Sequence, residues 1–175
     1  MHQINKQTLV ITILKQKIMG YTHYWNFKKN PKDVKDGEKK FKTAVKLLKK
    51  CLKNVPAELE MEVYDWKNNT TQKVNVPFKL CDGNGYGEPV FTDTLVCFNG
   101  DAEKDYDHET CYLALNNDNY EFDFCKTACK PYDVAVCLTL LCFKKAFGDD
   151  FSYSSDGNIE DEGWKMAHNI FNKIK

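Results

Sequence analysis

The chain of 175 residues is 42% hydrophobic and 13% aromatic, so it can bury one sizeable core and has the length of a single domain. Its 25 acidic and 25 basic residues cancel, which excludes general nucleic-acid binding and attraction to anionic membranes through overall charge. Every basic residue is a lysine. An anion site would therefore use lysine point charges, backbone N–H groups or a metal ion in place of the planar arginine fork.

Eight cysteines raise the question of disulfides, but no secretory signal pattern is present. Reduced, buried thiols in an intracellular protein are therefore expected. Cys125 and Cys129 are four residues apart without a second such pair, so the sequence assigns no metal site and names no cofactor. No apolar run reaches about 18 residues, and no membrane span is predicted. Five cysteines lie where an apolar residue is expected: Cys51, Cys97, Cys111, Cys137 and Cys142.

The N-terminal segment contains a second methionine, Met19, directly before Gly20. We expect residues 1–18 to be an extension and residues 19–175 to form the single domain. The extension has lysines but no acids, arginine or serine, which makes it a weak match to a mitochondrial presequence. A cytoplasmic location is therefore expected, with a mitochondrial one as the alternative.

Periodicity predicts the first elements in chain order. Residues 21–27 place aromatic side chains on one parity, as a strand does. Apolar residues recur at helical spacing over about 38–54 among many lysines, which predicts an amphipathic helix with a solvated basic face. Alternating segments at 59–63 and 74–80 predict a hairpin. The glycine-rich stretch 81–89 is expected to be a loop.

Three more strands are predicted over 94–98, 110–115 and 120–125. The last two are expected to pair as a second hairpin, because only the polar turn at 116–119 separates them.

The C-terminal third reads as helix, short strand and helix. Pro131 stands where a first helical residue is favoured, and an apolar helical face runs from there to Gly148. A short strand with a turn is expected at 151–157, and a final helix at 164–174. The sum is an α+β domain with a mostly antiparallel sheet of about six to seven strands, covered on one face by three helices.

Five segments form a pattern: MGYTHYW at 19–25, FNGD at 98–101, HET at 108–110, FCKTACKPYD at 124–133 and SSDG at 154–157. Together they resemble a family of hypothetical proteins associated with bacteria, viruses and some lower eukaryotes. The resemblance covers residues 19 to about 160, and residues 1–18 lie outside it. It implies no activity, because none is established for that family.

Polar residues gather around the start of the helix expected near residue 131. They are Lys126, Thr127, Lys130 and Tyr132. Free N–H groups and the positive end of the helix dipole attract anions, so this stretch predicts a binding site for a phosphate or carboxylate. The alternative is a polar loop, in which Thr127 makes local bonds and Asp133 stabilises the first helical turn.

Ser155 and Asp156 end a predicted strand before Gly157. They form an ordinary turn or present ligand-binding groups to a pocket. No G-x-S-x-G elbow supports a serine nucleophile, and neither a P-loop nor a dinucleotide fingerprint is present. Cys125 would be a candidate nucleophile if Lys126 or a histidine stabilised its thiolate.

Candidate acid–base groups are His23, within the aromatic strand, and His108 with Glu109, after an acidic loop. His23 has a structural alternative, as a core or surface histidine whose hydrogen bonds are made within the protein. The acidic loop 101–108 offers oxygen and imidazole ligands for a divalent cation. It lacks the glycine turn and closing glutamate of a calcium loop, so a solvated acidic loop is favoured and no metal is assigned.

Two function classes follow. The first is a small enzyme, such as a hydrolase, or a ligand-binding domain for an anionic small molecule or phosphate ester. Lys126 and Lys130 would hold the anion, while His23 or His108 with Glu109 supplied acid–base chemistry. The alternative is a non-catalytic interaction protein or accessory subunit, whose protein partner would contact exposed aromatics of residues 20–25 and the lysine-rich first helix.

Overall fold

The computed structural model describes residues 21–65 and 68–174, and the expected extension at 1–18 lies outside them. Its described part is an α+β fold, as predicted, with eight strands in antiparallel sheets and three α-helices. The sheet that positions the site is three-stranded. Strand β1 (Thr22–Phe27) lies at its centre, between β7 (Asp123–Lys126) and β8 (Phe151–Ser155).

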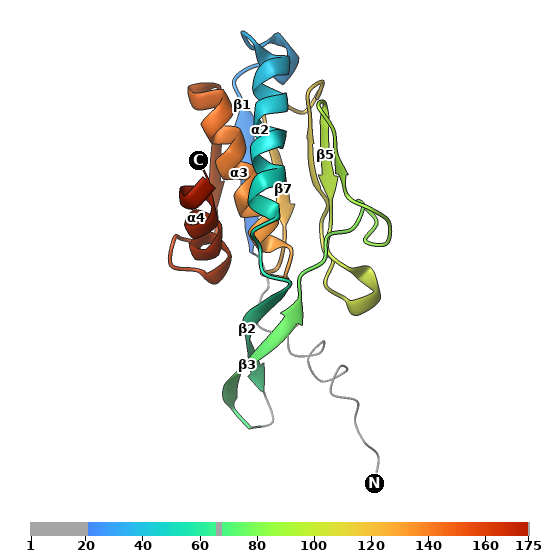
Figure 1. Ribbon diagram of the computed structural model, residues 1–175, viewed down its shortest axis with the longest axis vertical. Helices are drawn as coiled ribbons and strands as arrows, with labels where there is room; N and C mark the ends of the chain where they lie inside the picture. Colours follow the sequence, from blue (N-terminus) through green and yellow to red (C-terminus); the bar gives the residue numbers. More distant parts are fainter. Residues whose placement is uncertain (1–20, 66–67, 175) are drawn as a thin grey trace.

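The other strands form two further sheets, where one larger sheet was expected. Strands β2 (Glu58–Asp65) and β3 (Thr70–Pro77) pair as the predicted hairpin, which extends away from the helices (Figure 1). The third sheet has the order β4-β5-β6. It contains the expected strands β5 (Leu95–Phe98) and β6 (Cys111–Ala114), and a two-residue strand, β4 (Val90–Phe91), that the sequence did not indicate.

The predicted hairpin between β6 and β7 is wrong. Strand β6 pairs with β5, whereas β7 pairs with β1 from the other end of the sequence. Alternation of side chains defines the two faces of a strand but does not select its neighbour. Both strands therefore satisfy their patterns in different sheets. The consequence is that the end of β7 lies beside the start of β1, where the site is built.

Three helices lie side by side, and the middle one contacts both of the others and β1 (Figure 1). They are α2 (Gly37–Leu52), α3 (Asp133–Phe147) and α4 (Glu162–Ile174). Short 3-10 turns occur at Pro31–Asp33, Ala102–Lys104 and Gly148–Asp150. Helix α3 is the central one, and every residue from its first, Asp133, to Phe143 is buried. It ends at Gly148 as predicted, where a φ of 59° suits glycine.

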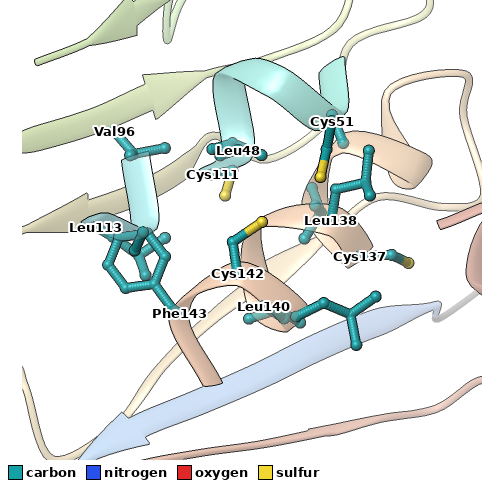
Figure 2. Packing of buried hydrophobic residues seen from close by; sticks show 14 of the residues in the cluster. Leu48, Cys51, Val96, Cys111, Leu113, Cys137, Leu138, Leu140, Cys142 and Phe143 are labelled. Carbon is teal, nitrogen blue, oxygen red and sulfur yellow. The ribbon is translucent and has the colours of Figure 1, made fainter. Parts of the chain in front are cut away.

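The core around the middle and C-terminal half of α3 is apolar and rich in rings. Phe143 packs edge-on against Phe27 and Phe41, with ring centroids 6.3 and 5.0 Å away. Figure 2 shows Cys51, Cys111 and Cys142 among leucines in the same core. All eight cysteines are free thiols, as predicted. Among the described helices, none combines the length and apolar character that a bilayer span requires.

Candidate functional site

The first strand brings three polar side chains to one face of its sheet. His23 of β1 lies directly opposite Cys125 of β7 on one side and Ser155 of β8 on the other. Residues that face each other across neighbouring strands point to the same side of the sheet, with Cβ atoms about 4.5–5.5 Å apart. This is the side that α3 covers, since His23 bonds to Asp133 at the start of that helix.

A sharp turn aims the start of α3 at His23. Ala128 and Cys129 both have a φ of 51°, a left-handed conformation unusual for residues with a Cβ. The backbone carbonyl of Tyr21 holds the turn, because it accepts hydrogen bonds from the N–H groups of Thr127 and Ala128 at 3.0 and 3.2 Å. The chain thus doubles back beside β1 before the helix begins, which places Asp133 under the sheet.

His23 and Asp133 form a buried pair. The Nε2 atom of His23 lies 2.7 Å from Oδ1 of Asp133, and the imidazole is 0% exposed. Thr127 donates its hydroxyl hydrogen to the same carboxylate oxygen, and the thiol of Cys137 donates to Oδ2 at 3.7 Å. The position of Asp133 at the first turn of α3 adds the favourable end of the helix dipole. Gly163 of α4 packs so closely that a Cβ there would overlap Oδ2.

Aromatic rings enclose the imidazole of His23. Tyr21 and Trp164 contact it edge-on, with centroids 5.4 and 5.5 Å away. The second ring nitrogen, Nδ1, is buried and has no hydrogen-bond partner among the described residues. Most buried polar atoms in proteins are paired, so an unpaired one calls for a functional explanation.

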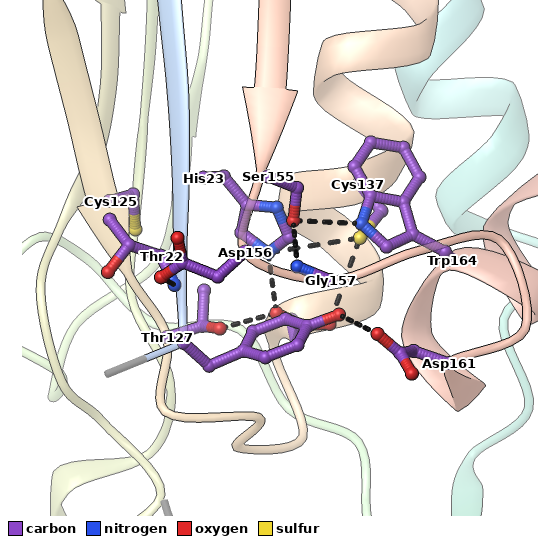
Figure 3. Close-up of polar contacts among 12 residues, drawn as sticks. Thr22, His23, Cys125, Thr127, Cys137, Ser155, Asp156, Gly157, Asp161 and Trp164 are labelled. Carbon is purple, nitrogen blue, oxygen red and sulfur yellow. Dashed lines mark hydrogen bonds and ion pairs between the residues drawn. The ribbon is translucent and has the colours of Figure 1, made fainter. Parts of the chain in front are cut away.

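Ser155 lies next to His23 (Figure 3) and lines a small pocket. Its Oγ accepts hydrogen bonds from the indole Nε1 of Trp164 at 3.1 Å and from the backbone N–H of Gly157 at 3.0 Å. The pocket has a volume of about 190 Å³. Its walls are mainly aromatic and apolar, formed by Tyr153, Ser155, Gly157, Asn158, Ile159, Trp164 and His168.

The turn after Ser155 is tied to the start of β1. Asp156 accepts hydrogen bonds from the backbone N–H of Thr22 at 3.0 Å and the hydroxyl of Tyr24 at 3.3 Å. The hydroxyl of Tyr21 donates to Asp161 at 3.1 Å. Burial, and next the charge of Asp133, raise the pKa of Tyr21 well above its usual range, which keeps this phenol a donor. The Asp156 carboxylate therefore stabilises the turn, which is the ordinary-turn interpretation of Ser155 and Asp156.

A second polar network adjoins the first and contains four more of the predicted residues, Glu109, Lys126, Lys130 and Tyr132. The carboxylate of Glu109 accepts the backbone N–H of Lys126 at 2.6 Å. The hydroxyl of Tyr132 donates to the backbone oxygen of Glu109 at 2.8 Å. The Nζ atom of Lys130 donates to the backbone oxygen of Asp107 and lies 3.4 Å from Oδ1 of Asp105, while the Lys130 side chain is only 10% exposed. These groups hold the loop before β6 against β7 and α3.

The structure thus brings some of the predicted site residues together and separates others. His23, Thr127 and Ser155 belong to one cluster. Strand alternation places the Lys126 side chain on the face of the sheet opposite to Cys125 and His23. His108 is exposed, and what is fixed there is its backbone, by two hydrogen bonds with the amide of Asn99 at 3.0 and 3.1 Å.

Two expectations about surfaces need correction. Trp25, which was expected to contribute to an exposed aromatic contact surface, is 3% exposed because it points to the helices with His23. In the acidic loop, Asp101 lies 3.3 Å from Nζ of Lys79 and is buried, so this part of the loop is ion-paired and not solvated.

The structure also shows groups whose role sequence reasoning missed. Asp133 was expected only to stabilise a helical turn, yet it binds His23 across 110 residues of sequence. The imidazole, this carboxylate and the thiol of Cys137 have ligand atoms within 4.8 Å of one another, a set that suits a metal such as zinc. No short spacing motif could reveal it, because the histidine comes from a distant strand.

Comparisons of the chain with protein-family models, curated proteins and solved structures found no match. The resemblance to a family of hypothetical proteins therefore stays a prediction.

Proposed function

We propose that the protein is a small hydrolase in which Ser155 is the nucleophile, His23 the general base and Asp133 the group that orients the base. One observation carries this proposal. The Nε2 atom of His23 contacts a buried carboxylate, whereas its Nδ1 atom has no partner among the described residues. Ser155 lies directly opposite His23 on the neighbouring strand. This is the order of groups in a Ser-His-Asp triad, with the two ring nitrogens exchanged relative to the serine proteases.

The donor and acceptor capacities of these groups support the assignment of Ser155, His23 and Asp133 as a triad. A carboxylate only accepts, so Nε2 of His23 carries the hydrogen and Nδ1 presents a lone pair. Both lone pairs of the Ser155 hydroxyl are engaged by N–H donors, which leaves its own hydrogen to be donated. Donation to Nδ1 of His23 would satisfy the unpaired buried nitrogen. The hydroxyl of Thr127 and the thiol of Cys137 fix the carboxylate of Asp133 in place.

The reaction follows from these positions. The Oγ atom of Ser155 attacks the electrophilic carbon or phosphorus of an ester, and its proton passes to Nδ1 of His23. That proton then leaves with the alcohol, and water hydrolyses the covalent intermediate by the same route in reverse. The N–H groups of Gly157 and Trp164 stabilise negative charge that develops on Oγ.

The pocket beside Ser155 favours a small, uncharged acyl group. Aromatic and apolar side chains form most of its lining, and the nearby carboxylates of Asp156 and Asp161 repel anions. An anionic molecule or phosphate ester, the class that the sequence favours, would need Lys126 or Lys130. The first lies on the other face of the sheet, and the second is paired with Asp105. Carboxylic esters are therefore the first substrates to test, with phosphate esters beside them.

The decisive experiment is covalent labelling with a fluorophosphonate probe, followed by mass spectrometry of the labelled peptide. We expect stoichiometric labelling of Ser155 and hydrolysis of a short-chain p-nitrophenyl ester. Ser155→Ala and His23→Gln should each reduce both signals by at least about 100-fold, the scale of a lost catalytic group. Ser154→Ala is the matched control, because that neighbouring serine is exposed and points to the opposite face.

Labelling that is absent from the folded wild-type protein, or that persists in Ser155→Ala, would refute the proposal. A thermal-shift screen with phosphates, nucleotides and p-nitrophenyl phosphate runs in parallel, because a ligand stabilises the folded state according to its affinity. A phosphate-dependent shift lost in Lys126→Ala or Lys130→Ala would restore the anion site. No labelling and no shift would favour the alternative, a non-catalytic interaction protein or accessory subunit.

A further inference from the structure

The side chains of His23, Asp133 and Cys137 form a compact triangle of metal-binding atoms. The Nε2 atom of His23 is 2.7 Å from Oδ1 of Asp133 and 4.0 Å from the Cys137 sulfur, which is 3.7 Å from Oδ2 of Asp133. All three residues are buried. One comes from β1 and two from successive turns of α3, so rigid elements hold the triangle together.

These separations are close to those of a tetrahedral zinc site. With Zn–N and Zn–O distances of about 2.0–2.1 Å and a Zn–S distance of about 2.3 Å, neighbouring ligand atoms lie about 3.3–3.6 Å apart. The separation of Nε2 from the Cys137 sulfur, and that of the sulfur from Oδ2, are within about 0.5 Å of this range, and with one ligand atom from each residue the three atoms lie within 4.8 Å of one another. The contact between Nε2 and Oδ1 has to widen, as it must when an ion replaces the shared hydrogen, and the carboxylate has to turn so that one oxygen faces both other ligands.

Charge also favours an ion of charge +2 at this position. The Asp133 carboxylate and a Cys137 thiolate neutralise it, which leaves no net charge in a buried site. The thiol resists ionisation without the metal, because burial and then the charge of Asp133 raise its pKa. A bound cation reverses both effects on the sulfur.

We propose that His23, Asp133 and Cys137 bind a zinc ion, and that this ion switches the hydrolase site off. Neutral imidazole has one nitrogen lone pair. When Nε2 coordinates the metal, the ring hydrogen moves to Nδ1, which then cannot accept the proton of Ser155. The thiol proton leaves to solvent, so each bound zinc ion releases one proton at neutral pH.

Inhibition, and not metal catalysis, follows from burial. His23 and Cys137 are 0% exposed and Asp133 is 5% exposed, so the fourth coordination position of a zinc ion between them is closed to a substrate. The binding of zinc stands on its own geometry, whereas the inhibitory role rests on the proposed hydrolase function.

The binding test uses the full chain, freed of metal and kept reduced with a phosphine. Cobalt(II) is the probe, because thiolate coordination gives an intense near-ultraviolet charge-transfer band and a tetrahedral site gives strong visible bands. We expect both bands to saturate at one equivalent and to disappear on addition of zinc. Cys137→Ala should abolish the thiolate band. It should also weaken zinc binding more than the loss of an outer-shell contact does, which typically costs about 10- to 100-fold in affinity.

Cys142→Ala is the matched control, since Cys142 is a buried thiol on the same helix that lies beside Cys51 and outside the cluster. It should keep the cobalt spectrum. No thiolate band in the wild-type protein, or an unchanged band in Cys137→Ala, would overturn the zinc site. His23→Gln provides a second test that leaves the thiol in place, and it should lower zinc affinity as strongly.

The regulatory part is tested by fluorophosphonate labelling with and without one equivalent of zinc. We expect zinc to slow labelling of Ser155 at least about 10-fold in the wild-type protein. In Cys137→Ala, the labelling rate with zinc should equal the rate measured for the same variant without zinc. If cobalt binds but Ser155 is never labelled in chelator, the hydrolase proposal fails and the metal site stands. If Ser155 is labelled and cobalt does not bind, only the zinc proposal fails.

Discussion

The two ends of helix α3 bury side chains of opposite chemistry. At its N-terminal end, Asp133 and Cys137 share a closed polar cluster with His23. Ten residues after Asp133, Phe143 lies in a cluster of rings that includes Phe27. Asp133, Cys137 and Phe143 are all buried, so depth alone does not distinguish the two ends. The difference lies in partners, because a buried ring needs only close contacts, whereas a buried carboxylate needs a donor for each oxygen.

The largest effect on stability is expected at the apolar end. Phe143→Ala removes a fully buried ring and leaves a cavity among its aromatic neighbours, which should lower the free energy of unfolding by about 3–5 kcal/mol. Urea denaturation measures it. Phe122→Ala is the matched control, since that ring is 61% exposed and should change stability by less than about 0.5 kcal/mol. Similar losses for both variants would mean that α3 does not carry the core.

A smaller loss is expected at the polar end. Asp133→Asn keeps the shape of the side chain but weakens the charge-assisted bonds from His23 and Thr127, which should cost about 1.5–3 kcal/mol. The same urea experiment measures it, with Asp93→Asn as the control, because the ion pair of Asp93 with Lys42 is exposed. Stability equal to that of the wild type would show that the carboxylate charge is not used in the buried cluster.

The most gradual effect is that of alkaline pH, which acts at both ends. Burial and then Asp133 raise the pKa of Cys137, while the hydrogen bond with Cys51 and then burial raise that of Cys142. A folded-state pKa above the unfolded value contributes stability that is present below the unfolded pKa, about 8.5 for a thiol, and is lost as pH rises further. We expect Tm to be flat near neutrality and to fall progressively above about pH 8.5.

The pH series also compares the two thiols. Cys137→Ala and Cys142→Ala should each make the decline of Tm with pH less steep than in the wild type, whatever their Tm at neutral pH. A Tm that stays constant to about pH 10 in the wild type would contradict the raised pKa of Cys137 and Cys142 in the folded protein.

Local patterns were enough to predict the elements that build α3 and its surroundings. The helix and its end were predicted from Pro131, a broad apolar face and Gly148. Strand β1 was predicted because aromatic side chains occupy alternate positions in residues 21–27. The pairing of β6 and β7 was wrong, because two alternating strands joined by a short turn have the same pattern whether or not they pair. Which sheet each joins depends on contacts with residues far away in sequence.

The candidate site divides in the same way. His23, Thr127 and Ser155 were identified from local signals, namely a histidine within the aromatic strand, a threonine just before a helix start and a serine at a strand end. The partnership of His23 with Asp133 was not, since it depends on the turn at Ala128 and Cys129, where two residues adopt a conformation that their types do not favour. Lys130 also shows the limit of composition, because its charge is used inside the molecule to hold a loop.

The sequence separations in the site have a consequence for the order in which the protein matures. His23 is synthesised early, but its carboxylate partner follows 110 residues later, and Tyr21 waits 140 residues for Asp161. At about 5–20 residues per second, the growing chain spends several seconds with an imidazole that has no partner and a strand with no neighbours. Whatever chemistry the site performs, it begins only after the segment from Tyr21 to Asp161 has left the ribosome.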